Sequence, residues 1–209
     1  MRTVYLSALM LLAADPQARF TKDSLGRLPP GWQAAKTGPG DGSVWKVVAD
    51  DTAPSKTGLA LAQTASGPEG MFNLCVATKN RFGPRLSVSV SLRPMEGESD
   101  QGGGVVWLYQ DANNYYVTRY NPLEDNFRVY KVVAGKRTQL QTIEKIEKRA
   151  GWHTIGVSHA GNKITCTLDN KHQLKVTDDT FSKPGLVGLW TKADARTHFD
   201  RFEAAQFEK

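Results

Sequence analysis

The sequence predicts an all-β protein, a two-sheet antiparallel β-sandwich with jelly-roll topology. Short runs of β-branched and aromatic residues recur along most of the chain. Gly, Pro, Asn and Asp cluster between these runs at intervals of about eight to twelve residues, a spacing typical of sandwiches and barrels. The only helical candidate, Ile143–Arg149, lacks an apolar face of useful length.

Length and composition favour one domain with a substantial core. The chain has 209 residues, of which 40% are hydrophobic, and all-β domains of this size are commonly single. We expect a signal peptide at 1–14, an extended leader at 15–43 that wraps the domain, and one sandwich domain at 44–209.

The N-terminus carries the pattern of a secretory signal. Met1-Arg2 is followed by the apolar run TVYLSALMLLAA and then by Asp15-Pro16, which predicts cleavage after Ala14 and a secreted or periplasmic protein. A buried N-terminal helix or strand is the alternative. The run is too short to span a bilayer, so we expect no stable membrane insertion.

The leader is rich in Gly, Pro and polar residues. Its segment Leu28-Pro29-Pro30-Gly31-Trp32 cannot form regular helix or central strand, because proline lacks the donor and fixes φ. We expect an extended segment along an edge of the fold, with Trp32 as its anchor.

The strands that follow are separated by turn-forming residues. The predicted strands before residue 100 are Val44–Ala49, Leu59–Thr64, Met71–Thr78 and Arg85–Arg93. Within the last of them, apolar residues and serines alternate from Leu86 to Leu92, which predicts a half-buried antiparallel strand. The predicted strands after residue 132 are Val132–Arg137, Thr138–Lys145, Trp152–Ser158, Lys163–Leu168, His172–Thr177, Leu186–Trp190 and His198–Phe207.

Two adjacent hairpins organise the middle of the chain. Strands at Val105–Gln110, Tyr115–Tyr120 and Phe127–Val132 are joined by a turn at Asp111–Asn114 and a polar loop at Asn121–Asn126. A four-residue first loop would place Val106 opposite Arg119 and Leu108 opposite Val117. A six-residue second loop would place Arg119 opposite Arg128 and Val117 opposite Tyr130.

Alternation then divides these strands into two faces. The face predicted to enter the core carries Trp107, Tyr109, Tyr116, Thr118, Tyr120 and Val129. The opposite face carries Gln110, Tyr115, Arg119, Arg128 and Tyr130, which form our candidate ligand-binding set. A slip of one residue in either loop would exchange the two faces.

Charge and cysteine content reduce the number of function classes that fit the chain. The formal net charge is +6, but the cations are interspersed, without the clustering that a nucleic-acid-binding protein needs. Cys75 and Cys166 each lie in an apolar alternating run, which predicts buried thiols. A disulfide between them is the alternative in an oxidising compartment.

Gly102-Gly103-Gly104 does not form a phosphate-binding loop. The Lys-Ser/Thr pair and the following helix that such a loop needs are missing. The glycines instead predict a bulge or a close backbone approach where a strand begins.

Acidic residues in the second loop have several alternative roles. Glu124 and Asp125 are weak catalytic candidates, together with His153, because paired carboxylates can cleave glycosides. The two carboxylates could instead order the turn or pair with the arginines, and a satisfied structural role is the alternative for His153. A structural Ca²⁺ ion held by Asn121, Glu124, Asp125 and Asn126 is a further alternative, although the spacing matches no calcium-loop motif; otherwise we expect no metal or cofactor.

The predicted Arg119–Arg128 pair needs an explanation. Like charges directly opposite each other destabilise a strand pair, so a carboxylate of Glu124 or Asp125, or a ligand, should offset them. Plain solvated surface arginines are the alternative.

Several stretches carry a family resemblance. They are Leu28-Pro29-Pro30-Gly31-Trp32, the segment GVVWLYQDANNYYVTR at 104–119, Trp152-His153-Thr154-Ile155, Gly185-Leu186-Val187-Gly188-Leu189-Trp190 and Phe199-Asp200. The chain resembles the concanavalin A-like lectin/glucanase superfamily, in particular bacterial laminin-G-like and 3-keto-disaccharide-hydrolase-type domains.

That resemblance implies a jelly roll, carbohydrate on one sheet and a secreted bacterial protein. The glucanase signature Glu-x-Asp-x-x-Glu is absent, so no catalytic role carries over. We therefore predict a secreted, lectin-like carbohydrate-binding domain. A glycoside hydrolase acting on a disaccharide, oxidised or not, or on a polysaccharide is the first alternative, and a structural or protein-interaction module is the second.

Overall fold

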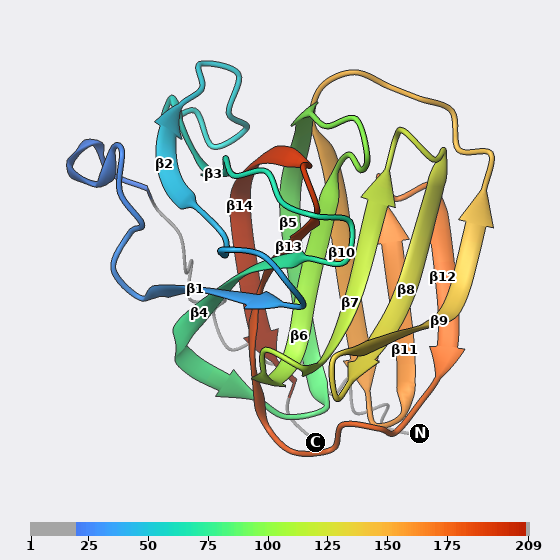
Figure 1. Cartoon of the computed structure of the whole chain (residues 1–209). Coiled ribbons are helices and arrows are strands. Elements are labelled where there is room, and N and C mark those ends of the chain that lie inside the picture. The colour runs from blue at the N-terminus through green and yellow to red at the C-terminus, as the bar shows by residue number, and fades with distance from the viewer. Residues whose placement is uncertain (1–19, 208–209) are drawn as a thin grey trace, which may run out of the picture.

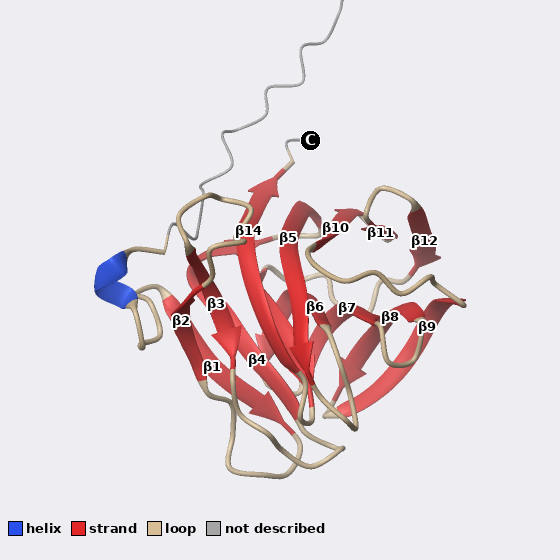
Figure 2. Cartoon of the chain, turned by 90° about the horizontal axis from the view of Figure 1, so that it is seen from above, coloured by secondary structure: helices blue, strands red, loops and turns tan. Residues whose placement is uncertain are grey.

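The computed structural model describes residues 20–207, which form two seven-stranded sheets stacked face to face (Figure 2). All pairings between the named strands are antiparallel, which confirms the predicted β-sandwich. A short 3-10 helix, η1 (Lys22–Ser24), precedes the first strand. In the described part of the chain, no helix has the length and apolar character needed to cross a membrane.

The strand order shows how distant segments meet (Figure 1). Sheet A contains, in spatial order, β12 (His172–Thr177), β11 (Lys163–Leu168), β10 (His153–Ala160), β5 (Arg85–Glu96), β14 (Arg196–Gln206), β3 (Leu59–Gln63) and β2 (Trp45–Ala49). Sheet B contains β1 (Trp32–Thr37), β4 (Phe72–Phe82), β13 (Gly185–Lys192), β6 (Gly103–Asp111), β7 (Asn114–Asn121), β8 (Asn126–Val133) and β9 (Lys136–Glu144).

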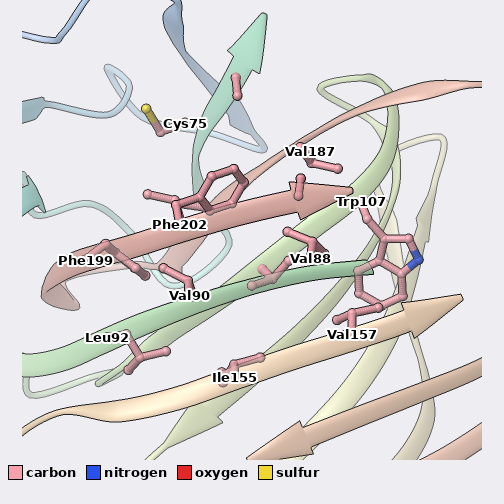
Figure 3. Packing of buried hydrophobic residues seen from close by; sticks show 14 of the residues in the cluster. Cys75, Val88, Val90, Leu92, Trp107, Ile155, Val157, Val187, Phe199 and Phe202 are labelled. Carbon is pink, nitrogen blue, oxygen red and sulfur yellow. The ribbon is translucent and has the colours of Figure 1, made fainter. Parts of the chain in front are cut away.

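The main core lies between the sheets and is built from alternate residues of both. Figure 3 shows Trp107 of sheet B beside Val88 and Val157 of sheet A. Trp107 stacks on Tyr116, with ring centroids 5.4 Å apart, and is fully buried. Its indole N–H donates to Nδ1 of His159 at 3.1 Å, so the one polar atom of this ring is satisfied.

The leader contributes a strand. β1 pairs with β4 at the edge of sheet B, and Trp32 packs edge-on against Phe202 at 5.1 Å. Residues 32–37 are therefore part of the sandwich, and Trp32 is buried as its anchor. The predicted signal peptide at 1–14 lies outside the described residues.

The first central hairpin corrects the predicted register. Asp111 pairs with Asn114 across a two-residue turn, and a bulge follows at Leu108, whose φ is 47°. Beyond the bulge Val106 faces Val117, and Gly104, not Val106, faces Arg119. Three residues of β6, 108–110, stand opposite the single residue Tyr115 of β7, so the pairing beyond this bulge is moved by two positions from the predicted one.

The second hairpin has the predicted register. Arg119 faces Arg128 and Val117 faces Tyr130 across β7 and β8. Trp107, Tyr116, Tyr120 and Val129 enter the main core, as predicted. Tyr109 does not, because the bulge turns it to the other side of sheet B, where its ring lies 6.1 Å from that of Tyr115.

The two cysteines are free and fully buried. Both belong to the main core, Cys75 on β4 and Cys166 on β11. Burial raises the pKa of Cys166 to about 12, so its thiol stays protonated and unreactive at neutral pH. The prediction of buried thiols is confirmed, and no disulfide joins them.

Candidate functional site

The outer face of sheet B carries a second apolar cluster, separate from the main core. Because side chains alternate between the two sides of a strand, every second residue of β4, β13, β6, β7 and β8 lies on this side. The members of this outer cluster are Phe72, Leu74, Val106, Tyr115, Val117, Tyr130, Val132 and Trp190. All are buried although they lie on the outward side of the sandwich. Side chains at the margin of the face must therefore cover them.

A charged network borders this cluster on one side. Arg119 is 1% exposed, and its Nη2 donates to Glu124 Oε2 at 2.8 Å. The same oxygen accepts from Arg128 Nη1 at 3.1 Å, so Glu124 bridges the two opposed arginines. The carboxylate predicted to offset the pair is thus Glu124.

Glu124 is held ionised. Burial alone would raise the pKa of its carboxyl, but hydrogen bonds from Asn126 and Arg119, together with the two nearby guanidinium charges, lower it to about 2. A carboxylate with so low a pKa cannot serve as a general acid at neutral pH. Its role in this structure is electrostatic.

The network extends in both directions along the sheet. Asp100, almost fully buried, accepts from Lys192 Nζ at 2.9 Å and from the Asn121 amide at 3.1 Å. Glu144 accepts from Arg128 Nη2 at 3.0 Å and from the Thr142 hydroxyl at 2.7 Å. Each carboxylate on this face therefore already has cationic and neutral donors.

Arg137 of β9 is the exception among the charged groups. Its guanidinium carbon lies 4.5 Å from the ring centroid of Tyr130, 4.9 Å from that of Phe72 and 5.9 Å from that of Trp190. Among the described residues it forms no ion pair and no hydrogen bond, and its Nη1 is buried without a partner. Burial lowers the pKa of Arg137, and repulsion from Arg119 adds to this. The side chain is a half-buried cation held only by aromatic faces.

Several other buried polar atoms on this face also lack partners. They are the donors Nε and Nη1 of Arg119 and Nε1 of Trp190, the hydroxyl of Tyr130, and one acceptor, Oδ1 of Asn126. Tyr130 lies near Arg128, and Trp190 near Tyr115, without reaching hydrogen-bond geometry. Folded proteins pair most buried polar groups. This concentration of unpaired donors therefore marks a place where a ligand or ordered water completes the structure.

The structure brings most of the predicted binding residues together. Tyr115, Arg119, Arg128 and Tyr130 share the outer face of sheet B. Gln110 does not join them, because the bulge redirects it and its amide donates to the carbonyl oxygens of Leu108 and Lys183, each at 3.1 Å.

Sequence reasoning missed two contributors. Trp190 reaches the face through β13, which inserts between β4 and β6, a pairing that local sequence does not reveal. Arg137 could have been found, because Ala134-Gly135 marks the β8–β9 turn, and its register places Arg137 opposite Val132.

The predicted catalytic candidates do not assemble. Asp125 pairs with Lys148 at 3.5 Å rather than with the arginines. The ring of His153 is tilted by 50° against that of Tyr120, with centroids 4.7 Å apart, and Tyr120 belongs to the main core on the other side of sheet B from Glu124. Within residues 20–207 no group of three or more acidic, His or Cys side chains could hold a metal ion. Of the oxygens considered for calcium, that of Asn121 accepts from a backbone amide, Glu124 accepts from the arginines and Asp125 pairs with Lys148, while Oδ1 of Asn126 has no hydrogen-bond partner.

His153 instead supports a pH-dependent structural pair. Its Nδ1 lies 2.7 Å from Asp169 and its Nε2 lies 3.0 Å from the Arg149 carbonyl. Burial by itself lowers the pKa of His153, but these two contacts outweigh it and the pKa is raised. Both ring nitrogens then donate, so the imidazolium is the stabilised form.

We expect the His153→Gln variant to lose more stability in acid than in base. A raised folded-state pKa stabilises the protein below the unfolded value of about 6.5, and this contribution disappears as pH rises through the folded pKa. Urea unfolding of wild type and variant should show a larger difference at about pH 5.5 than at about pH 9. An equal difference for His153→Gln at both pH values would contradict the charged pair.

A hollow on the outer face of sheet A is the other candidate. It has a volume of about 320 Å³, and small residues of β5, β10, β11 and β14 line it, among them Ser89, Gly156 and Thr167. Glu203 is its one charged residue, and it contains no aromatic ring. Sugar sites combine aromatic faces with planar polar groups, so this hollow is the poorer candidate.

Comparisons with known proteins identify the fold. No family model and no curated protein matches the chain. Among solved structures, the carbohydrate binding module CBM66 from Bacillus subtilis is 16% identical, with a TM-score of 0.66 over 84% of this chain and 96% of that one. A galectin-like protein of unknown function from Bacillus subtilis is 11% identical, with a TM-score of 0.61 over 95% and 97% of the two chains.

A third similar structure is the exoplasmic/lumenal domain of VIP36 in its Ca²⁺/mannose-bound form. It is 10% identical, with a TM-score of 0.61, and the match covers 94% of this chain and 92% of that one. At these identities the likeness concerns the fold. The chain has the two-sheet jelly roll of the concanavalin A-like type, which confirms the resemblance at the level of architecture.

Proposed function

We propose that this protein is a carbohydrate-binding domain whose ligand site is the outer face of sheet B. One observation carries the proposal: unpaired buried donors gather there beside aromatic rings. The groups involved are the guanidinium groups of Arg119 and Arg137, the indole of Trp190 and the hydroxyl of Tyr130. Sugars present many closely spaced oxygens and apolar ring faces, and both features match this surface.

The similar structures also support carbohydrate binding. One is a carbohydrate-binding module by name, and another was solved with mannose. Both share the jelly-roll fold with this chain, although a fold alone does not define a ligand. The donors on sheet B give the proposal its location, and that location can be tested directly.

The Tyr130→Phe variant tests ligand binding without an expected loss of folding stability. The Tyr130 hydroxyl is buried without a hydrogen bond in the free protein, so its removal should leave the melting temperature unchanged or slightly raised. A saccharide that bonds this hydroxyl should bind about 2- to 10-fold more weakly to the variant. Calorimetric titration with a panel of oligosaccharides measures the change, and a rise in wild-type melting temperature identifies which members bind.

The matched control is Tyr120→Phe. It also removes a buried hydroxyl without a hydrogen bond, but this one lies in the main core on the other side of sheet B. Affinity should be unchanged in that variant. Equal losses in both variants, or no stabilisation of the wild type by any saccharide, would overturn the proposal.

The proposal also includes export from the cytoplasm. It is supported by the charged start and apolar run of residues 1–14. Expression of the full chain followed by mass measurement of the exported protein should give a mature N-terminus at Asp15. Retention of Met1 in a protein confined to the cytoplasm would contradict export.

A further inference from the structure

The unpaired groups on sheet B differ in kind from those of a site for neutral sugars. Arg119 Nε, Arg119 Nη1, Arg137 Nη1 and Trp190 Nε1 can only donate hydrogen bonds. Beside these donors lie one unpaired buried group that can both donate and accept, the Tyr130 hydroxyl, and one that can only accept, Asn126 Oδ1. A neutral sugar hydroxyl both donates and accepts, so it would need acceptors as well.

Each carboxylate on this face already accepts hydrogen bonds from the protein. Glu124 Oε2 accepts from Arg119, Arg128 and Asn126. Asp100 accepts from Lys192 and Asn121, and Glu144 from Arg128 and Thr142. The face therefore offers donors with few free acceptors, which fits an oxygen-rich group without hydrogens.

The balance of charges around the outer cluster independently indicates the same kind of ligand group. Four cations border the outer cluster: Arg119, Arg128, Arg137 and Lys192. Three carboxylates face them, Asp100, Glu124 and Glu144, and Arg137 is the cation that none of them contacts. An unpaired, partly desolvated cation is costly in the free protein. An anionic ligand would remove that cost.

The two guanidinium groups converge on one place. Arg119 and Arg137 both lie against Tyr130, with guanidinium carbons 6.0 Å and 4.5 Å from its ring centroid. Tyr130 lies on β8, between the strands that carry the two arginines. Arg137 retains partial exposure while Tyr130 and Arg119 are almost fully buried. A ligand arriving from solvent would meet Arg137 first.

We infer that the saccharide bound by sheet B carries an anionic group, a carboxylate or a sulfate, held by Arg137 and Arg119 above the Tyr130 ring. This inference rests on the proposed function and specifies its ligand class. Guanidinium groups form charge-assisted, bidentate bonds with such groups, about twice as strong as neutral hydrogen bonds. The sugar ring itself would contact the aromatic groups around Arg137.

Three matched oligosaccharides test the inference: a galacturonate oligomer, a neutral galactose oligomer of equal length, and a sulfated galactose oligomer. Calorimetric titration should show at least about 10-fold tighter binding of one acidic oligomer than of the neutral one. Affinity for that acidic oligomer should fall as the salt concentration increases, because salt screens the attraction between its anionic group and the partly exposed guanidinium group of Arg137. The relative affinities for carboxylated and sulfated oligomers distinguish the two anionic groups.

The Arg137→Gln variant should lose about 10- to 100-fold in affinity for the acidic oligomer and little for the neutral one. Arg85→Gln is the control, since Arg85 is an exposed arginine of β5 in sheet A. Equal affinity of all three oligomers, unaffected by salt and by Arg137→Gln, would overturn the inference and leave the proposed function standing. Absence of binding by every oligosaccharide of the wider panel would overturn both.

Discussion

Replacing Gly104 by alanine is expected to cost about 4 kcal/mol or more, or to prevent folding. A Cβ atom at this position would lie 1.7 Å from the Thr118 carbonyl oxygen and 2.8 Å from the Arg119 Cα. These are backbone atoms of β7, so only a displacement of the strand could relieve the clash. Urea unfolding followed by tryptophan fluorescence measures the loss.

Gly83→Ala is the control for that prediction. The nearest atom to a Cβ at Gly83 is in the Gln206 side chain, 3.8 Å away. Its stability should stay within about 1 kcal/mol of the wild type. A similarly small effect for Gly104→Ala would mean that β6 and β7 do not approach so closely.

Replacing Glu124 by glutamine should destabilise the protein by about 2–3 kcal/mol. The change removes the charge that neutralises Arg119, whose nearest remaining carboxylate, Asp100, is 4.0 Å away. A fully buried pair would lose about 3–5 kcal/mol. The smaller figure reflects the 35% exposure of Glu124, through which solvent screens the interaction.

The pH dependence of this contribution has a defined sign. The pKa of Glu124 is lowered to about 2 in the folded state, so its stabilisation is present above the unfolded value of about 4.3 and disappears as pH falls towards 2. Wild type and Glu124→Gln should therefore converge in acid. Glu147→Gln is the control, because Glu147 is 81% exposed and its pair with Arg149 should contribute less than about 1 kcal/mol. A loss that is the same at neutral and at acid pH would argue against the charge network.

At Arg137 we expect the requirements of folding stability and of ligand binding to conflict. Arg137 covers aromatic rings without a counter-charge, an arrangement that a structural role alone does not require. Protein sites that bind charged ligands commonly keep such unfavourable groups in the free state. The affinity measurements on Arg137→Gln therefore address both the ligand class and the reason for this residue.

Local sequence patterns were enough to predict the sandwich, most of its strands and the register of the second hairpin. Alternation from Leu86 to Leu92 identified a strand with one buried face, and Asn121 and Asn126 fixed the turn that sets Arg119 opposite Arg128. The Gly102–Gly104 run predicted close backbone contact, which the short distances at Gly104 confirm. These features depend on which residues favour turns and on the two-residue period of side chains along a strand. Short stretches of sequence are therefore enough to predict them.

The set of residues that share the candidate site depends on the three-dimensional packing of the strands. The bulge at 108–110 moved Tyr109 to the outer face and Gln110 away from it, because three residues of β6 stand there opposite one residue of β7 and the regular alternation is lost. Trp190 reached the site because β13 inserts between β4 and β6, strands distant from it in sequence. Such long-range pairings depend on how both sheets bury their apolar faces together, and no local pattern specifies them.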